Sequence, residues 1–221
     1  MTRPLVIFGQ ADMAELAHYY FTRDQGRTVA AFAVDAEWLR EDSFCGAPVV
    51  PFETLARSHP PEEFDLFVAL GYSRLNALRR ARFEAGLAMG YDLASYVSPR
   101  ACVLNDGAIG RNCFILEDNT IQPFVRIGDN VTLWSGNHIG HHSVIEDHVF
   151  ITSHVVVSGR CRIGEAAFLG VNATLRDGIS IGARCVIGAG ALMLADAEPE
   201  GVYMGTASER ARVPSTRLRG I

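Results

Sequence analysis

The sequence lacks several features that would assign it to whole classes of protein. It has no excess of positive charge, because 20 Lys and Arg face 25 Asp and Glu, giving a net charge of −5 and a pI of 5.8. This balance excludes the basic surface typical of nucleic-acid-binding proteins. No run of 18 apolar residues is present, so we expect no membrane-spanning helix. The N-terminal segment MTRPLVIFGQ lacks the successive regions of a signal peptide, and we expect a cytoplasmic protein.

Cysteine pairs at metal-binding spacing are also absent. The five cysteines form no CxxC motif, and three of them fall at small inward positions of the repeat described next. They are most simply core residues in a protein of a reducing compartment. The cysteines are Cys45, Cys102, Cys113, Cys161 and Cys185.

What the sequence does contain is a six-residue repeat that runs from Val97 to Met193 without insertion. Every sixth residue is Val, Ile or Leu, and we call these residues the anchors. Six is a multiple of the two-residue period of a strand, so the anchors would all face the same side, whereas a helix would scatter them. The anchors are Val97, Val103, Ile109, Ile115, Ile121, Ile127, Leu133, Ile139, Ile145, Ile151, Val157, Ile163, Leu169, Leu175, Ile181 and Ile187, followed in register by Met193.

A hexapeptide repeat of this kind predicts a parallel β-helix in which three units form one 18-residue turn. The anchors would stack into one aliphatic core. Two other sets recur: small residues two before an anchor, and glycines directly after it, which we expect to relieve the corners where side chains are unfavourable. The period does not determine the handedness, and such a solenoid can be a scaffold only. The small residues are Cys113, Ser143, Cys161, Ala167, Ala173 and Cys185; the glycines are Gly110, Gly128, Gly140, Gly164, Gly170, Gly182 and Gly188.

The first part of the chain has no hexads and alternates apolar strands with amphipathic helices. Strands are expected at 4–9, 28–34 and 65–71, and helices at 12–23, 51–58 and 73–84, the last with Ser73 as its N-cap. This alternation predicts a small parallel sheet, Rossmann-like in outline. We therefore expect two domains, residues 1–92 and residues 93–221.

Three strand ends in the first domain would meet at one edge of the sheet. The turn Gly9-Gln10-Ala11-Asp12 is not a GxGxxG motif, yet it places a helix N-terminus where anions bind. Asp35 ends the second strand, where an acidic residue would meet a ribose or a base, and Gly71-Tyr72 ends the third. Ordinary turn chemistry explains each of these alone. Together they suggest a nucleotide-bearing ligand at this edge.

Five of the seven histidines lie between Trp134 and Gly159. His142, His148 and His154 are six residues apart, so they would occupy three successive sides of the coil and would not converge on one ion. We therefore expect no metal site, and we expect His148 and His154 to hydrogen-bond their neighbours at the corners.

His141 and Gly159 are 18 residues apart, which is one full turn, so they should stack on the same face. An imidazole can take a proton from an attacking amine or hydroxyl while a bare backbone N–H stabilises an oxyanion. With no side chain at 159 to shield the amide, this pair is suited to acyl transfer.

The hexads, together with the segment NHIGHHSVIEDHVFITSHVVVSG, resemble the left-handed β-helix acyltransferases. The closest resemblance is to the group that acetylates nucleotide-linked sugars, which includes sialic acid O-acetyltransferases and amino-sugar N-acetyltransferases such as perosamine N-acetyltransferase. It covers the whole chain. It implies an α/β Rossmann-like domain that holds the nucleotide sugar, followed by an all-β left-handed parallel β-helix. It also implies a homotrimer with coenzyme A along the solenoid and active sites between subunits.

The resemblance implies roles for single residues. It makes His141 the general base and the Gly159 amide the oxyanion donor. Family members often carry an acid directly after the base, where this chain has His142; Glu146, Asp147 or another group could replace that carboxylate. The resemblance further implies a loop at 202–207 that closes over the coenzyme, here without the usual proline after Gly205-Thr206. The coenzyme contacts it implies are Gly159, Gly170, Gly188, Ala189 and Gly205.

These features favour an acetyl-CoA-dependent N-acetyltransferase that acts on a nucleotide-linked 4-amino-deoxysugar of the GDP-perosamine type. The amine would attack the thioester directly, and the product would enter a surface polysaccharide such as O-antigen. Two alternatives stay open: a sugar O-acetyltransferase, and a non-catalytic solenoid that binds a sugar nucleotide. We expect no metal, nucleic-acid or membrane partner.

Overall fold

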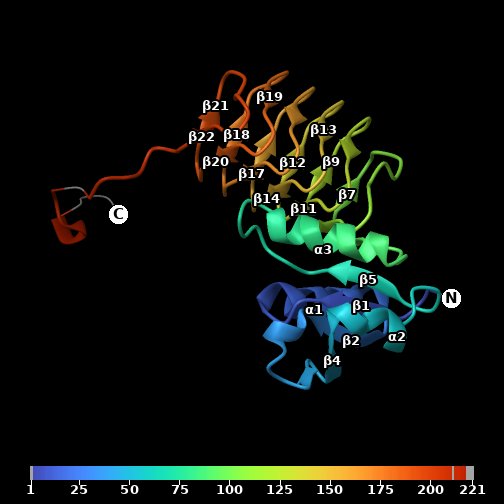
Figure 1. Ribbon diagram of the computed structural model, residues 1–221. Helices are drawn as coiled ribbons and strands as arrows, with labels where there is room; N and C mark the ends of the chain where they lie inside the picture. Colours follow the sequence, from blue (N-terminus) through green and yellow to red (C-terminus); the bar gives the residue numbers. More distant parts are fainter. Residues whose placement is uncertain (1, 211, 218–221) are drawn as a thin grey trace.

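The computed structural model describes residues 2–210 and 212–217. An α/β region comes first, which we call the front region (residues 2–92), and a parallel β-helix follows, which we call the coil region (residues 93–205). Figure 1 shows α3 lying between the sheet of the front region and the coil region. None of the helices in the described residues has the length and apolar character needed to cross a membrane.

The front region is built on a five-stranded sheet in the order β3-β4-β2-β1-β5. All neighbours pair in parallel except β3 and β4. The four parallel strands are thus ordered third, second, first and fourth along the chain, the order of half a dinucleotide-binding fold. The predicted strands and the first helix are confirmed, while β3 and β4 were not predicted. The elements are β1 Leu5–Phe8, α1 Asp12–Gln25, β2 Val29–Val34, β3 Ser43–Phe44, β4 Ala47–Pro51, α2 Leu55–Ser58, β5 Asp65–Val68 and α3 Ala77–Ala88, with 3-10 turns at Ala36–Trp38 and Phe52–Thr54.

Helix α3 begins at Ala77, so the predicted start at Ser73 is wrong. Residues 74–76 are left-handed, with φ of 52°, 51° and 65°, and a helix does not pass through such a turn. Asn76 is buried, donates from Nδ2 to the Ala166 carbonyl and accepts at Oδ1 from Arg79. These long-range hydrogen bonds hold a turn that local propensity does not predict.

The coil region has three two-residue strands in each 18-residue turn. They form three parallel sheets, which we call the first, second and third faces. Partners are 18 residues apart throughout; Thr132 pairs with Phe150, for example. The first face contains β6 Tyr96–Val97, β8 Phe114–Ile115, β11 Thr132–Leu133, β14 Phe150–Ile151, β17 Phe168–Leu169, β20 Val186–Ile187 and β22 Val202–Tyr203; the second β7 Cys102–Val103, β9 Thr120–Ile121, β12 His138–Ile139, β15 Val156–Val157, β18 Thr174–Leu175 and β21 Leu192–Met193; the third β10 Arg126–Ile127, β13 Val144–Ile145, β16 Arg162–Ile163 and β19 Ser180–Ile181. A last 3-10 turn spans Ser215–Arg217.

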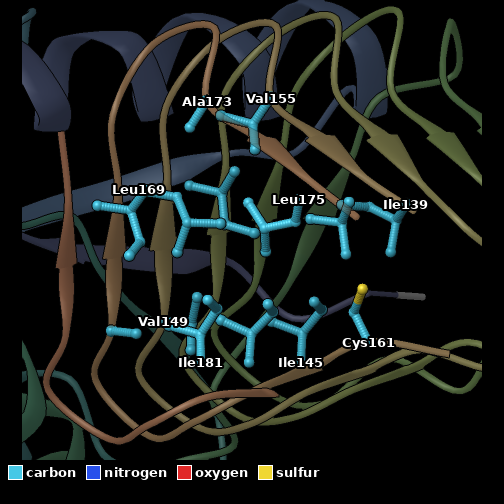
Figure 2. Packing of buried hydrophobic residues seen from close by; sticks show 14 of the residues in the cluster. Ile139, Ile145, Val149, Val155, Cys161, Leu169, Ala173, Leu175 and Ile181 are labelled. Atoms are coloured by element: carbon cyan, nitrogen blue, oxygen red, sulfur yellow. The ribbon is translucent and has the colours of Figure 1, made fainter. Parts of the chain in front are cut away.

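The anchors form one continuous core, as predicted (Figure 2). From Ile115 to Ile187 each anchor is at most 4% exposed. Cys113, Cys161 and Cys185 lie inward between them, and burial raises the pKa of Cys113 to about 12, so it stays a neutral thiol. The prediction that these cysteines are core residues is confirmed.

The glycines after the anchors are needed for a reason other than the predicted one. The left-handed corner residues are those three after an anchor, such as Asn130 and His142, with φ of 58° and 60°. Gly140 has no positive φ; instead, a Cβ there would lie 2.6 Å from the Gly159 nitrogen. A side chain at such a position would push neighbouring turns apart, so close approach of the backbone requires the glycine.

The front region and the coil region share one apolar cluster. Phe114 and Leu116 of the coil pack with Phe21 and Phe67 of the front region. Beside them, the Asn112 side chain pairs with the edge of β5: Val68 N–H donates to Oδ1 at 2.7 Å, and Nδ2 donates to the Val68 carbonyl at 3.3 Å. The Asn112 amide thus takes the place of a further strand at this edge.

Arg79 of α3 fastens the two regions from inside. It is 1% exposed, and none of the ion pairs found in the described residues supplies it with a carboxylate. Its donors instead reach neutral oxygens: Nη1 the Asn130 carbonyl at 2.5 Å, and Nη2 the His148 carbonyl at 2.8 Å and Asn76 Oδ1 at 3.0 Å. The guanidinium also lies 5.5 Å from the centre of the Phe150 ring. Burial lowers the pKa of Arg79 to about 9, which still leaves it charged at neutral pH.

Replacing Arg79 with alanine should lower the free energy of unfolding by about 2–4 kcal/mol, because several buried carbonyls lose their donors. Arg80→Ala is the matched control, since its side chain is half exposed and pairs with Glu84 and Glu165 at the surface. Exposed ion pairs are worth less than about 1 kcal/mol. Urea denaturation measures both variants, and equal losses would contradict the assigned role of Arg79.

Candidate active site

The corner between the second and third faces brings His141 and Gly159 together, as the 18-residue spacing predicts. A Cβ on Gly159 would lie 2.7 Å from Cε1 and 2.8 Å from Nε2 of His141, so the imidazole lies directly against this glycine. Any side chain at 159 would displace the ring. The His141 amide donates to Gln122 Oε1 at 2.8 Å, and the His141 carbonyl accepts from Arg160 N–H at 2.8 Å. The backbone of His141 is therefore fixed, while its side chain is exposed.

His142 contacts the imidazole of His141 from the other side. The two Nδ1 atoms are 3.1 Å apart, and the His142 ring packs on Phe124 with centroids 4.7 Å apart. Between two neutral rings one Nδ1 must donate and the other accept. If His141 acts as a base through Nε2, its Nδ1–H is the donor and His142 is the acceptor. The contact that sequence reasoning expected of His142 is present.

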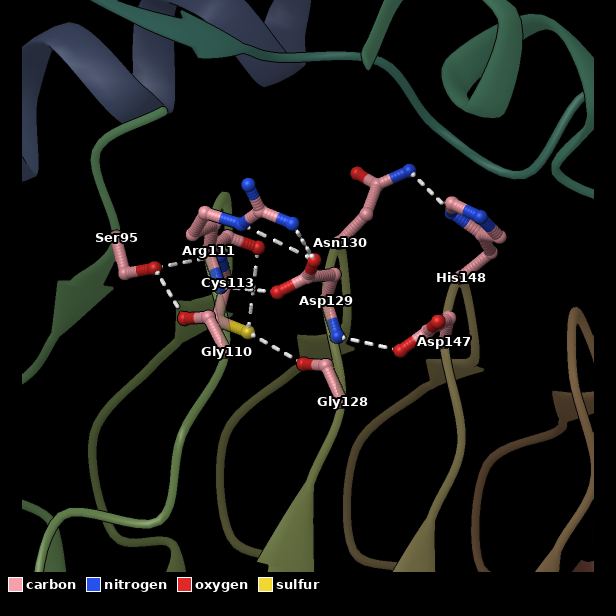
Figure 3. Close-up of polar contacts among 9 residues, drawn as sticks. All are labelled: Ser95, Gly110, Arg111, Cys113, Gly128, Asp129, Asn130, Asp147 and His148. Atoms are coloured by element: carbon pink, nitrogen blue, oxygen red, sulfur yellow. Dashed lines mark hydrogen bonds and ion pairs between the residues drawn. The ribbon is translucent and has the colours of Figure 1, made fainter. Parts of the chain in front are cut away.

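Neither of the carboxylates considered as replacements contacts His141. Glu146 and Asp147 lie at a different corner, between the third and first faces. Glu146 accepts from Glu165 N–H and pairs with Arg162, and Asp147 accepts from Asp129 N–H (Figure 3). In the described residues His142 is the group in hydrogen-bonding contact with the His141 ring.

The Gly159 amide is not free, contrary to expectation. It donates to Oδ1 of Asp177 at 2.8 Å. Asp177 lies one further turn along the chain and its side chain is exposed. The expectation considered only the absent side chain at 159. The same 18-residue spacing that pairs His141 with Gly159 also pairs Gly159 with Asp177, so the signal was available.

The other histidines lie apart from this pair. His148 is buried and its Nδ1 lies 2.9 Å from Asn130 Nδ2 (Figure 3), and burial lowers the pKa of His148. His154 lies beside Gly136 at the corner between the first and second faces. His142, His148 and His154 thus occupy three corners, as predicted. Within residues 2–210 and 212–217, no group of three His, Cys, Asp or Glu side chains could hold a metal ion.

A cavity of about 760 Å³ lies at the carboxyl ends of β1, β2 and β5. Gly9, Gln10, Ala11 and Asp35 line it, as predicted. Asp12, Gly71 and Tyr72 lie outside its lining; the Tyr72 ring turns toward the first face and packs on Phe150 and Phe168. The lining residues not predicted are Phe8, Val34, Glu37, Trp38, Arg40, Glu41, Phe44, Leu70, Arg74, Leu78 and Arg82.

Charge in this cavity is partly paired. Arg82 Nη2 lies 2.7 Å from Asp35 Oδ2, whereas Arg74, on the left-handed turn, is exposed and makes no ion pair with the described acids. Ala11, the N-cap of α1, has no side-chain oxygen to accept from the first turn, so these N–H groups suit an anion. Gly9 has φ of 131°, and a Cβ there would lie 2.8 Å from the Ala69 carbonyl oxygen.

The residues expected to contact coenzyme A fall into two groups. Gly170, Gly188, Ala189 and Gly205 stack at the corner between the first and second faces; a Cβ on Gly170 would lie 2.6 Å from Ala189 N, and one on Gly188 would lie 3.4 Å from Gly205 N. Gly159 lies at the opposite edge of the second face. The two groups therefore border the same sheet from its two sides.

Comparison with known proteins agrees with this arrangement. Residues 106–141 and 124–159 match the family "Bacterial transferase hexapeptide (six repeats)", and residues 160–194 match "Hexapeptide repeat of succinyl-transferase". This chain belongs to the hexapeptide-repeat acyltransferases. Parallel sheets of hexapeptide repeats and likeness to solved acetyltransferases fit a left-handed β-helix.

Two curated relatives cover part of the chain. Serine acetyltransferase 2 of Arabidopsis thaliana is 35% identical over 42% of this chain and 32% of its own length. An acyl-[acyl-carrier-protein]–UDP-N-acetylglucosamine O-acyltransferase of Burkholderia mallei is 25% identical over 55% of this chain and 48% of its own length. The chain thus spans between a third and a half of these curated relatives.

Two solved structures match nearly the whole chain. The acetyltransferase domain of PglB from Neisseria gonorrhoeae is 26% identical, with a TM-score of 0.80 and 92% of this chain and 97% of that one covered. A perosamine N-acetyltransferase from Caulobacter crescentus is 25% identical, with a TM-score of 0.81 and coverage of 93% and 95%. The latter is a His→Asn variant in complex with CoA and GDP-perosamine; the PglB domain has also been solved with acetyl coenzyme A.

Substitutions at His141 and His142 should separate the base from the group that orients it. We expect His141→Ala to lower kcat by roughly 10²- to 10⁴-fold, the usual contribution of a general base, and His142→Ala to lower it less. His142→Asp should shift the acid limb of the pH profile of kcat/KM to higher pH, because an anion beside Nδ1 stabilises the imidazolium. Equal losses in the two alanine variants would make His142 part of the proton transfer. An unmoved profile for His142→Asp would exclude its orienting role.

Proposed function

We propose that the protein is an acetyl-CoA-dependent N-acetyltransferase that acts on the amino group of a nucleotide-linked 4-amino-deoxysugar. The observation that carries the proposal is the imidazole of His141 lying against the Gly159 amide, on a coil of the acyltransferase family. Two structural neighbours that are acetyltransferases bound to CoA or acetyl coenzyme A support the choice of donor.

In the proposed reaction the sugar amine attacks the thioester carbonyl of acetyl-CoA directly. His141 Nε2 takes the proton that the nitrogen loses as the C–N bond forms. The Gly159 N–H donates to the oxyanion of the tetrahedral intermediate, a contact worth about 10²- to 10³-fold in kcat in comparable sites. The C–S bond then breaks and CoA leaves as its thiol, with the proton returned from the imidazolium. His142 holds the ring through the Nδ1 contact.

The cavity at the end of the front sheet is proposed to hold the nucleotide part of the substrate. Its volume of about 760 Å³ is in the usual range for small-ligand sites. The uncapped N-terminus of α1 and the unpaired Arg74 would receive the diphosphate, and Asp35 would meet the ribose or the base. GDP-perosamine bound to the Caulobacter neighbour supports this substrate class. Residues 1–92 would thus bind the nucleotide sugar, and residues 93–221 would carry the chemistry and coenzyme A.

We propose that three copies of the chain assemble around the second faces of their coils. The first face is covered by the front region, and the third carries Arg126 and the Arg162–Glu146 pair. The outward residues of the second face are uncharged except where His138 takes up a proton, and both groups of proposed coenzyme contacts border it. A cyclic trimer would enclose three equivalent clefts. The outward residues are Cys102, Thr120, His138, Val156, Thr174 and Leu192.

The test is mass spectrometry of nucleotide sugars incubated with acetyl-CoA and the protein. The panel pairs GDP-, UDP- and dTDP-linked 4-amino-4-deoxysugars with the matching 4-hydroxy sugars, and the His141→Ala variant is the control. We expect one added acetyl group on a 4-amino sugar alone. Addition to a 4-hydroxy sugar would favour the O-acyl transfer that the Burkholderia relative's name describes. No addition to any sugar would favour a binding scaffold. Light scattering of the same sample gives its mass, and a fully active monomer would contradict a shared site.

Arg74→Ala should weaken binding of GDP or UDP by about 10-fold, because one charge-assisted hydrogen bond to phosphate is lost. Binding of CoA should be unchanged, since its proposed contacts lie on the coil. Arg57→Ala removes an exposed arginine of the front region outside the cavity and serves as the control. Calorimetry with each ligand measures these affinities. A nucleotide affinity that survives the loss of Arg74, or an equal loss of CoA affinity, would contradict the division of roles.

A further inference from the structure

Carboxylates accept hydrogen bonds from backbone N–H groups at several corners of the coil. Asp147 Oδ1 accepts from Asp129 N–H, and Asp129 Oδ1 accepts from Arg111 N–H, both at 2.7 Å (Figure 3). Asp177 makes the same contact with Gly159, at 2.8 Å. In each case the acid lies 18 residues after the donor. One more hydrogen bond between neighbouring turns is therefore the ordinary contribution of such an acid.

The amide that Asp177 occupies differs from the others in its surroundings. It belongs to the residue against which the His141 imidazole lies, with Nε2 2.8 Å from the place of a Cβ on Gly159. The proposed mechanism assigns this N–H to the oxygen of the thioester. The carboxylate of Asp177 thus holds the hydrogen bond that the acyl group needs.

The acyl group and Asp177 compete for this donor. A single N–H makes one strong hydrogen bond, and a carboxylate oxygen at 2.8 Å takes it fully. A negative charge beside the thioester oxygen would also oppose the charge that develops there. Asp177 is exposed and takes part in none of the ion pairs of the described residues, so its side chain can rotate into solvent.

We propose that Asp177 controls the entry of the acyl group into the site. Its carboxylate holds the Gly159 N–H in the free protein and leaves when the thioester carbonyl arrives. No bond forms or breaks in this step, since one hydrogen-bond acceptor replaces another. The inference rests on the proposed acyltransferase function and adds a residue that regulates that site. It follows that acetyl-CoA must displace Asp177 to bind, whereas CoA, which has no acyl oxygen, need not.

The experiment compares the affinities of acetyl-CoA and CoA by calorimetry in the wild-type protein and in Asp177→Ala. We expect the variant to bind acetyl-CoA about 3- to 10-fold tighter, the effect of removing one competing hydrogen bond, with CoA affinity unchanged. Asp177→Asn keeps an acceptor oxygen without the charge, so it should shift the ratio of the two affinities in the same direction by less. It carries the test if Asp177→Ala does not fold.

Asp147→Ala is the matched control, because it too removes an exposed aspartate that accepts from a backbone N–H one turn earlier. Asp147→Ala should leave the ratio of acetyl-CoA to CoA affinity unchanged, even where it lowers stability. A ratio that is also unchanged in the Asp177 variants would overturn the proposal while leaving the acyltransferase assignment intact. A wild-type protein that binds neither ligand would overturn both.

Discussion

The 18-residue hydrogen-bonded turn is the constraint on which the rest of the structure depends. Each strand pairs only with strands 18 residues before and after it, so residues at that spacing are forced into contact on one face or at one corner. His141, Gly159 and Asp177 form such a set. The approach is close enough that Gly140 tolerates no Cβ above the Gly159 nitrogen. A single insertion between 141 and 177 would therefore separate the imidazole, the amide and the carboxylate together, without any change to their identities.

A second constraint fixes the front region relative to this ladder. Arg79 donates to the backbone of two successive turns, at Asn130 and His148, and it is positioned by Asn76. Asn76 ends the left-handed turn whose first residue, Arg74, faces the cavity. The same few residues therefore join the coil to the edge of the front sheet. Because the guanidinium binds only neutral oxygens, its charge is stabilised by carbonyl dipoles and by the Phe150 ring. The rigid joint makes the distance between the cavity and the coil a property of the fold.

Sequence periodicity carried the coil region and the pairing of His141 with Gly159, because both depend only on spacing. It failed where contacts between distant segments decide the local backbone. The start of α3 moved from Ser73 to Ala77 since Asn76 bonds to Ala166, and Tyr72 left the cavity to pack on Phe150 and Phe168. Half of the cavity lining comes from residues that have no motif, such as Trp38 and Arg82. Asp177 was missed for a different reason: the spacing rule was applied once, from 141 to 159, and not a second time.

The arrangement of charge at the catalytic corner follows from these contacts. The related enzymes that this chain resembles often place a carboxylate directly after the base, where it would stabilise the imidazolium. Here that position is His142, whose neutral ring offers His141 one hydrogen bond and no charge. The carboxylate of this corner is Asp177, on the side of the amide. A negative charge there stabilises the free protein through the Gly159 N–H and opposes the oxyanion. Since the same charge acts in opposite directions in the two states, it favours the empty site over the acylated one until the side chain moves. The corner therefore combines a neutral support for the base with a mobile anion at the amide, and both features follow from residues placed by one 18-residue period.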